Sequence, residues 1–442
     1  MNNKPEHHPS MNASLVAKML RYRWWIFLIL GVAYLLVYFH RLSLSVVADD
    51  LIFEFATSAG VMGLLSSIYF YCYAVMQLPA GLLSDSIGPR RTVSAFLLVA
   101  AAGSIMFGMA PTIEVAFFSR VLVGFGVSMV FIPTMKILAQ WFRKDEFASM
   151  AGLFNAVGGM GVLAGTWLLG YMAQSMGWRI SFVLIGAGTL VIVVLAWLVV
   201  RDRPQDKGWP SIADIENQQA TPPPAAIPLL AGLGRVLSEK SFWPVAVWFF
   251  FDCGLFFGFG GLWAGPYLMH VYGLSRAQAG GVLSMIAWGM IIGSPLMGFF
   301  SDRVVKSRKK PFIICGVVLC AEMLFLYLNP DGLSLAALYG VFFVFSICAS
   351  SIVIVGFTTT KELFPVSMAG TSVGAVNLFP FLGGAIYMPL LGRVLDSVPQ
   401  PTPGSYALEG YTLMLLVLLA SAVAALCCTF FMKETFTKQA HG

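Results

Sequence analysis

Long apolar runs alternate with short polar segments along the whole chain. The first run, Trp24–Val47, built as a helix rising about 1.5 Å per residue, is long enough to cross a hydrocarbon core of about 30 Å. Lipid offers no partner to an unpaired backbone group, so the runs are predicted to be helices. The twelve predicted spans are Trp24–Val47, Ala59–Leu83, Thr92–Ala110, Phe117–Phe142, Ser149–Ala173, Ile180–Val200, Phe242–Leu268, Ala279–Phe300, Pro311–Leu328, Leu335–Phe357, Thr371–Gly392 and Tyr411–Met432.

The polar segments between the runs differ in charge. The segments on the side of the N-terminus carry 21 Lys and Arg, whereas those on the other side carry only Arg179 and Arg276. Because Lys and Arg concentrate in cytoplasmic loops, both termini are predicted to be cytoplasmic. Four further cations lie within the runs themselves: Arg41, Arg120, Lys136 and Arg393.

The chain repeats itself. The segment GLLSD that begins at Gly81 returns as GFFSD at Gly298, 217 positions later, and SMAG at Ser149 returns at Ser367. This duplication predicts an all-α membrane protein of twelve transmembrane helices in two six-helix pseudo-repeats. The expected division is a cytoplasmic tail at 1–23, an N-terminal bundle at 24–200, a Pro- and Gln-rich linker at 201–241, a C-terminal bundle at 242–432 and a tail at 433–442.

Composition agrees with a polytopic membrane protein. Hydrophobic residues make up 58% of the chain and charged residues 11%, against about 25% charged in a soluble domain. The net charge of +6 follows from orientation in the bilayer, so no nucleic-acid partner is expected. The seven cysteines all lie in apolar runs, and we predict no disulfide, no metal site and no cofactor.

Arg41 is the most informative residue, because a cation inside a membrane run is costly and usually functional. Tyr34, Tyr38, Arg41 and Ser45 recur at spacings of three and four and form one polar helical stripe. Arg41 either faces a watery cavity and binds an anionic substrate, which we favour, or extends to the outer headgroups.

Four further charged residues in the spans, besides Arg41, have candidate roles. Asp252 in the seventh span either carries the proton that couples transport, in one state paired with Lys136, or forms a static ion pair between the halves. Lys136 is either a second substrate cation or a side chain that extends to the inner surface. Arg120 is interpreted as structural, or as an outer-side coupling residue. Glu322 is interpreted as a structural acid.

Several polar-tipped side chains complete the candidate substrate site. Each of them more often packs in a core than binds a ligand, but as a set they could hold a small hydroxylated anion. They are Tyr38, Tyr69, Tyr73, Asn155, Trp288, Asn377 and Tyr387.

Gly81-x-x-x-Asp85-x-x-Gly88-x-Arg90-Arg91 resembles the signature loop of the major facilitator superfamily, and Gly298–Lys310 resembles its second copy. The fourth-span sequence from Arg120 to Gly126 also resembles a family motif. The resemblance implies two bundles that rock around a central site, and a loop that gates the inner face. The gating residues it implies are Gly81, Asp85, Gly88, Arg90, Arg91, Asp302 and Arg303.

Within that superfamily the chain resembles the organophosphate antiporters and the anion:cation symporters. Tyr38–Ser45 is similar to their first-helix arginine motif, and Pro133–Phe142 to their fourth helix. Where the phosphate-ester antiporters have a second arginine and a histidine, this chain has Phe256-Phe257-Gly258 and Asn155. A phosphate dianion would therefore lack one of the two cationic groups that bind it in those antiporters, so a carboxylate substrate is expected.

The expected function is therefore secondary transport of a small organic anion, by proton symport, in a multi-pass monomer of a cell membrane such as a bacterial inner membrane. The sequence contains no nucleotide-binding loop, so the energy source is expected to be an ion gradient. A transporter is expected, not an enzyme. Two other hypotheses remain: an exporter or exchanger of a metabolite or chelator, and a transporter-like ligand sensor.

Overall fold

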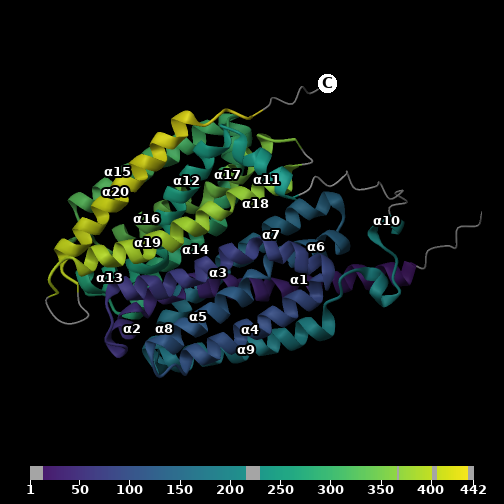
Figure 1. Ribbon diagram of the computed structural model, residues 1–442, viewed down its shortest axis with the longest axis horizontal. Helices are drawn as coiled ribbons and strands as arrows, with labels where there is room; N and C mark the ends of the chain where they lie inside the picture. Colours follow the sequence, from purple (N-terminus) through teal and green to yellow (C-terminus); the bar gives the residue numbers. More distant parts are fainter. Residues whose placement is uncertain (1–12, 216–228, 366–367, 401–405, 437–442) are drawn as a thin grey trace, which may run out of the picture.

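The computed structural model describes residues 13–215, 229–365, 368–400 and 406–436. Over these residues it contains the predicted twelve helices that are long and apolar enough to cross a membrane. The helices lie in two groups, an N-terminal half and a C-terminal half (Figure 1). The start of the first helix and the end of the last lie at one end of the molecule, called the termini end below; the opposite end is the distal end.

In the N-terminal half, six membrane crossings are built from eight α-helices, because two crossings are interrupted. They are α1 (Ala13–Leu42), α3 (Ala59–Ser86), α4 (Pro89–Gly108), α5 (Ile113–Ser128) with α6 (Phe131–Trp141), α7 (Lys144–Leu163) with α8 (Leu169–Met176), and α9 (Trp178–Val199). A 3₁₀ turn at Ser43–Val46 extends α1, and the short α2 (Ala48–Glu54) follows it at the distal end.

The C-terminal half has the same order. Its crossings are α12 (Phe242–Leu255) with α13 (Ala264–Tyr272), α14 (Arg276–Phe299), α15 (Lys309–Leu328), α16 (Leu335–Ser346) with α17 (Val353–Glu362), α18 (Ala369–Val376) with α19 (Leu378–Asp396), and α20 (Leu408–Phe431). A π-helical segment, Phe256–Trp263, joins α12 to α13. Such segments are frequent at functional sites, and this one places two aromatic rings beside the central cavity.

Helix α1 begins at Ala13, well before the predicted start of the first span at Trp24. The extra turns are held by packing and charge. Tyr22 packs on Trp141 and Trp209, with ring centroids 5.8 and 5.2 Å apart, and Arg23 pairs with Glu146 at 2.6 Å. Polar residues are tolerated in a helix that leaves the hydrocarbon region, so the helix extends beyond the membrane span that hydropathy predicts.

The segment after α9, predicted as a plain linker, has local structure. It contains the two short helices α10 (Ile212–Ile215) and α11 (Leu229–Ser238). Its first part packs on the N-terminal half, where the Nε1 of Trp141 donates to the carbonyl oxygen of Arg201 at 2.9 Å. The half-buried Trp209 packs on Trp141 in this segment. The Pro-rich composition did not predict this contact.

The two halves meet closely at the distal end. A Cβ added at Gly63 of α3 would lie 2.4 Å from the carbonyl oxygen of Met388 in α19, so the two backbones are in direct contact. The carboxylate of Asp396 at the end of α19 accepts from the backbone amides of Ala59 and Gly60, at 3.0 and 2.7 Å. A C-terminal side chain therefore caps an N-terminal helix, where the helix dipole favours a negative charge.

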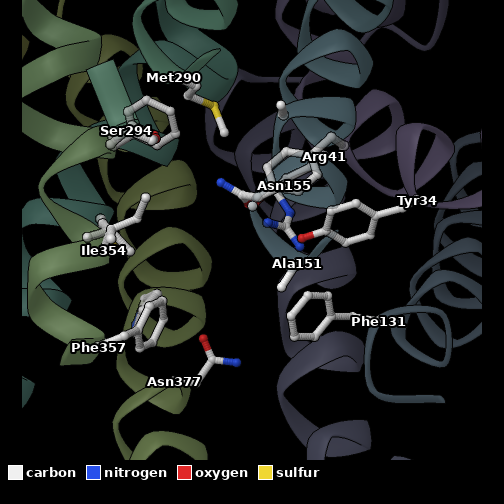
Figure 2. Close-up of a pocket in the computed structure, with 18 of the residues that line it drawn as sticks. Tyr34, Arg41, Phe131, Ala151, Asn155, Met290, Ser294, Ile354, Phe357 and Asn377 are labelled. Carbon is white, nitrogen blue, oxygen red and sulfur yellow. The ribbon is translucent and has the colours of Figure 1, made fainter. Parts of the chain in front are cut away.

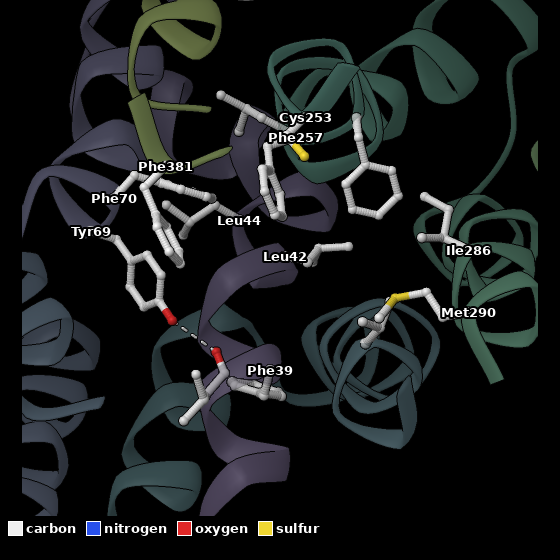
Figure 3. Close-up of a cluster of buried hydrophobic side chains, with 14 of the residues drawn as sticks. Phe39, Leu42, Leu44, Tyr69, Phe70, Cys253, Phe257, Ile286, Met290 and Phe381 are labelled. Atoms are coloured by element: carbon white, nitrogen blue, oxygen red, sulfur yellow. Dashed lines mark hydrogen bonds between the residues drawn. The ribbon is translucent and has the colours of Figure 1, made fainter. Parts of the chain in front are cut away.

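Ion pairs add to this distal contact. Asp49 and Asp50 of α2 contact two side chains of the other half, His270 at 3.0 Å and Arg276 at 2.5 Å. A cluster of buried apolar side chains also joins the two halves (Figure 3). In that cluster Phe70 packs on Phe257 across the two halves, with ring centroids 4.8 Å apart. The distal end is thus closed by polar contacts, helix capping and apolar packing together.

Closure at the distal end is expected to depend on pH through Asp50. Burial raises the pKa of its carboxyl, against the opposing effect of Arg276. In an open form Asp50 would be hydrated and return toward its usual pKa of about 3.9. The closed form therefore binds the proton more tightly, so a fall in pH should increase the closed population.

Spin labels at Phe53 and Leu335, two exposed positions of opposite halves near the distal end, would measure this shift. The labels require replacement of the accessible Cys320, Cys427 and Cys428. Between about pH 7 and about pH 4.5, the short-distance population should grow. In Asp50→Asn, which cannot titrate, the growth should be smaller; an equal response would contradict the assignment to Asp50.

Candidate functional site

A cavity of about 710 Å³ lies between the two halves. Its lining runs from Arg41 in the centre to Gly152 near the start of α7, Gly298 near the end of α14 and Val373 in α18. These last residues lie toward the termini end. The cavity therefore extends toward the termini end, while the distal end is closed. If the termini are cytoplasmic, as the charge bias predicts, this is an inward-facing arrangement.

The guanidinium of Arg41 lies in this cavity and only 7% of the residue is exposed. Aromatic rings surround it: its Cζ is 4.4 Å from the ring centroid of Tyr38, 5.1 Å from that of Tyr73 and 5.3 Å from that of Phe381. Rings at these distances attract a cation through their electron-rich faces. In the part of the chain that the structure describes, no Asp or Glu forms an ion pair with Arg41.

Other polar side chains line the same cavity from both halves. Asn155 of α7 lies close to Arg41, with Tyr34 beside it (Figure 2). On the opposite side are Ser294 of α14 and Asn377 at the start of α19. The structure thus brings together five of the predicted substrate residues: Tyr38, Arg41, Tyr73, Asn155 and Asn377.

Four other predicted substrate residues do not line the cavity. The hydroxyl of Tyr69 donates to the carbonyl oxygen of Val37 at 3.0 Å (Figure 3), and Tyr387 donates to the hydroxyl of Ser421 at 2.6 Å. Trp288 is 43% exposed on the outer surface of the helices, and Lys136 lies outside the lining. Helical periodicity identifies a face but not which neighbour covers it, which is why these side chains were grouped with the site.

Asp252 is buried, with 2% exposure, one residue before the cavity-lining Cys253. Among the described residues it forms no ion pair, so the hypothetical pair with Lys136 is not made in this conformation. Glu322 of α15 is also buried in this half, at 8% exposure. A carboxyl in such surroundings is costly to keep charged, which is a property expected of a proton-binding group.

Arg120 is almost fully buried inside the N-terminal half. Its Nη2 donates to the carbonyl oxygen of His40 at 3.1 Å, and its Cζ lies 5.5 Å from the ring centroid of Tyr69. Both contacts are to residues near Arg41 on α1 and α3. Arg120 therefore packs against the residues of α1 and α3 that adjoin Arg41.

The signature loop makes contacts within its own half. The backbone amide of Arg90 donates to Asp202 at 2.6 Å, and its Nη2 donates to the carbonyl oxygen of Trp197 at 2.6 Å. Gly88 has a φ of +91°, a conformation that L side chains rarely adopt. Arg91 is exposed, whereas the surroundings of Gly81 and the side chain of Asp85 lie outside what the structure describes.

The second copy of the loop is centred on a residue that the sequence analysis did not select. Arg308 contacts Asp302 and pairs with Glu362 of α17 at 2.8 Å, while Arg303 is exposed. The basic run Arg308-Lys309-Lys310 was the available signal. In both copies the observed contacts join segments of one half, as expected when the termini end is open.

The sequence analysis also did not identify the aromatic and hydroxyl residues that line the cavity from the C-terminal half, across from Arg41. Phe256 and Phe257 were noted only because an arginine was absent there, and Ser294 and Ser350 were not considered. The run of glycines after Phe257 was the local signal, because it accompanies the π-helical segment that turns these rings toward the cavity.

Twelve membrane helices in two matching halves, around a cavity closed at one end, define a membrane transporter. A family model described as the Major Facilitator Superfamily matches residues 26–388. The chain belongs to this superfamily and is a multi-pass membrane transporter rather than an enzyme.

Several characterised or named proteins are similar over most of their length. The probable galactarate/D-glucarate transporter GarP of Escherichia coli K12 is 24% identical, over 92% of this chain and 94% of GarP. The hexuronate transporter of Bacillus subtilis is 28% identical, over 84% and 80%. The membrane sensor protein UhpC of Salmonella typhimurium is 25% identical, over 85% and 87%.

The fold also matches solved structures. A crystal structure of a mutant form of the nucleoside transporter NupG superimposes with a TM-score of 0.74 at 14% identity, over 92% of this chain and 100% of that one. At this identity the match concerns the fold alone.

Proposed function

We propose that this transporter carries a small organic anion by alternating access, with Arg41 as the cation that binds it. The observation that carries the proposal is the guanidinium of Arg41, held in the cavity between the halves without a carboxylate partner among the described residues. A buried cation is costly unless something compensates for it. An anionic substrate would supply that compensation each time it enters.

The relatives support this substrate class. Two of them carry names that specify sugar acids, which are carboxylates. Tyr38, Tyr73, Asn155 and Asn377 lie around the same cavity and would orient the bound anion through hydroxyl and amide groups. Lys136, Tyr69, Trp288 and Tyr387 are not part of this proposed site.

Transport requires the site to open to each side in turn. In the proposed cycle the two halves rock, so that the distal contacts separate while the termini end closes. The loops around Arg90 and Arg308 would then come together at the termini end. Uptake of labelled carboxylates into proteoliposomes of the purified chain tests this function, and failure of all anions to accumulate or exchange would refute it.

Asp252 is proposed to carry the coupling proton. Its burial makes the neutral form favourable here, and access to water in another state would release the proton. Asp252→Asn should abolish accumulation driven by a proton gradient, a loss of about tenfold or more in gradient-driven uptake. Substrate exchange without a gradient should persist. If gradient-driven uptake survives in the variant, another group carries the proton.

A ligand sensor is a second candidate, because one similar protein is named a membrane sensor. The same cavity could hold a ligand without moving it. Exchange of labelled for unlabelled substrate by the purified chain alone distinguishes the two functions, since a sensor that does not transport would show none. The direction of transport, import or export, follows from the same vesicles when the gradient is reversed.

A further inference from the structure

The two walls of the central cavity differ in chemistry. The N-terminal wall holds the cation, Arg41, together with tyrosines and Asn155. The C-terminal wall contributes Ser294, Ser350 and Asn377, but most of its surface is apolar, and none of its described lining residues is charged. Its larger apolar members are Phe256, Phe257, Met290, Ile291, Ile354 and Phe357.

A ligand that fills the cavity must contact both walls. A second carboxylate would be removed from water without meeting a second cation among the described lining residues, which is strongly unfavourable. Hydroxyl groups on a sugar chain would face carbon along much of the C-terminal wall, and each unmade hydrogen bond lowers affinity by about fivefold or more. An apolar body would instead gain from burial against the same wall.

The positions of the side chains agree with a ligand that has one charged end and one apolar end. Figure 2 shows Ile354 and Phe357 of α17 across the cavity from Arg41 and Asn155. Phe257 lines the same cavity next to the cation, with its ring centroid 5.7 Å from the Cζ of Arg41. The cavity volume of about 710 Å³ lies in the range that holds ligands of one or two rings.

We propose that the substrate is an amphipathic monocarboxylate, whose single carboxylate binds Arg41 and whose aromatic or branched apolar body lies against Phe257, Ile354 and Phe357. This proposal rests on the organic-anion function proposed above. It differs from the sugar diacids named for GarP, which carry a carboxylate at each end of a hydroxylated chain.

Binding of defined acids to the purified full-length chain tests the proposal, by calorimetry or thermal shift. The probes are phenylacetate and 4-phenylbutyrate, with gluconate and glucarate as hydroxylated acids of one and two carboxylates. The phenyl acids should bind about tenfold or more tightly than gluconate, and glucarate should bind weakest. Tighter binding of gluconate or glucarate would overturn the amphipathic substrate but leave an organic-anion transporter standing.

Variants distinguish the contribution of the C-terminal wall to binding from the contribution of Arg41. Ile354→Ala should weaken binding of phenylacetate by about three- to tenfold and leave gluconate unchanged. The matched control is Ile314→Ala, because Ile314 is 44% exposed on α15 and lies outside the cavity lining. An equal loss for both acids in Ile354→Ala would contradict the proposed contact. If Arg41→Gln binds every acid as well as the natural chain, the underlying organic-anion function fails as well.

Discussion

Replacing Arg41 by glutamine should weaken binding of carboxylate substrates by about 10- to 150-fold, because hydrogen bonds to a charged partner contribute about 1.5–3 kcal/mol. The Cζ of Arg41 lies among aromatic rings and only 7% of the residue is exposed, and this burial strengthens its attraction for an anion. Arg41→Lys should lose less, since it keeps the charge but not the forked pair of donors. Calorimetry with phenylacetate and counterflow in proteoliposomes would measure both losses.

The melting temperature of the same variant separates binding from folding. A cation that lacks a carboxylate partner is a cost to the empty protein, so Arg41→Gln should melt at the same or a higher temperature. A structural arginine would give the opposite result. Arg235→Gln is the matched control, because Arg235 is exposed on α11 outside the cavity lining and should affect neither binding nor melting. Unchanged binding in Arg41→Gln would remove the basis for an anionic substrate.

The framework of this protein could be predicted from its sequence because the bilayer restricts the possible structures. Apolar runs such as Trp24–Val47 have to form helices, and the repeated loop at Gly81 and Gly298 relates the two halves. The boundary at Ala13 could not be predicted in the same way. It depends on Tyr22 and Arg23, whose partners come from distant parts of the chain.

Which residues line the cavity could be predicted where charge dominates but not where packing dominates. Arg41 was identified because a cation in lipid is too costly to be incidental. Tyr73 and Trp288 looked alike in sequence, yet the first lines the cavity and the second is exposed on the surface of the helices. Their difference lies in the rotation of each helix against its neighbours, which a single helix pattern does not contain.

The distal contact explains why the sequence places glycines where the halves meet. In a rocking cycle the two surfaces must come together and separate repeatedly, so backbones without side chains allow a close but reversible contact. A Cβ added at Gly265 of α13 would lie only 1.7 Å from the carbonyl oxygen of Ser45 in the other half. That oxygen belongs to backbone and cannot move aside as a flexible side chain could.

Gly265→Ala should therefore prevent the distal end from closing and reduce transport by about a hundredfold or more, since a clash this severe exceeds the few kcal/mol that separate alternating states. The spin labels at Phe53 and Leu335 should report a longer distance than in the natural chain. Gly188→Ala on α9 is the matched control, because nothing lies within 4 Å of the added Cβ. It should transport normally.

A second substitution guards against simple misfolding. Gly63→Ala places its Cβ against the carbonyl oxygen of Met388 across the same junction, and it should lengthen the same distance. Both variants should still bind phenylacetate, because neither glycine lines the cavity. If either variant transports at the natural rate with an unchanged distance, these backbones do not meet during the cycle. The alternating closure of the distal end would then require a different contact between the halves.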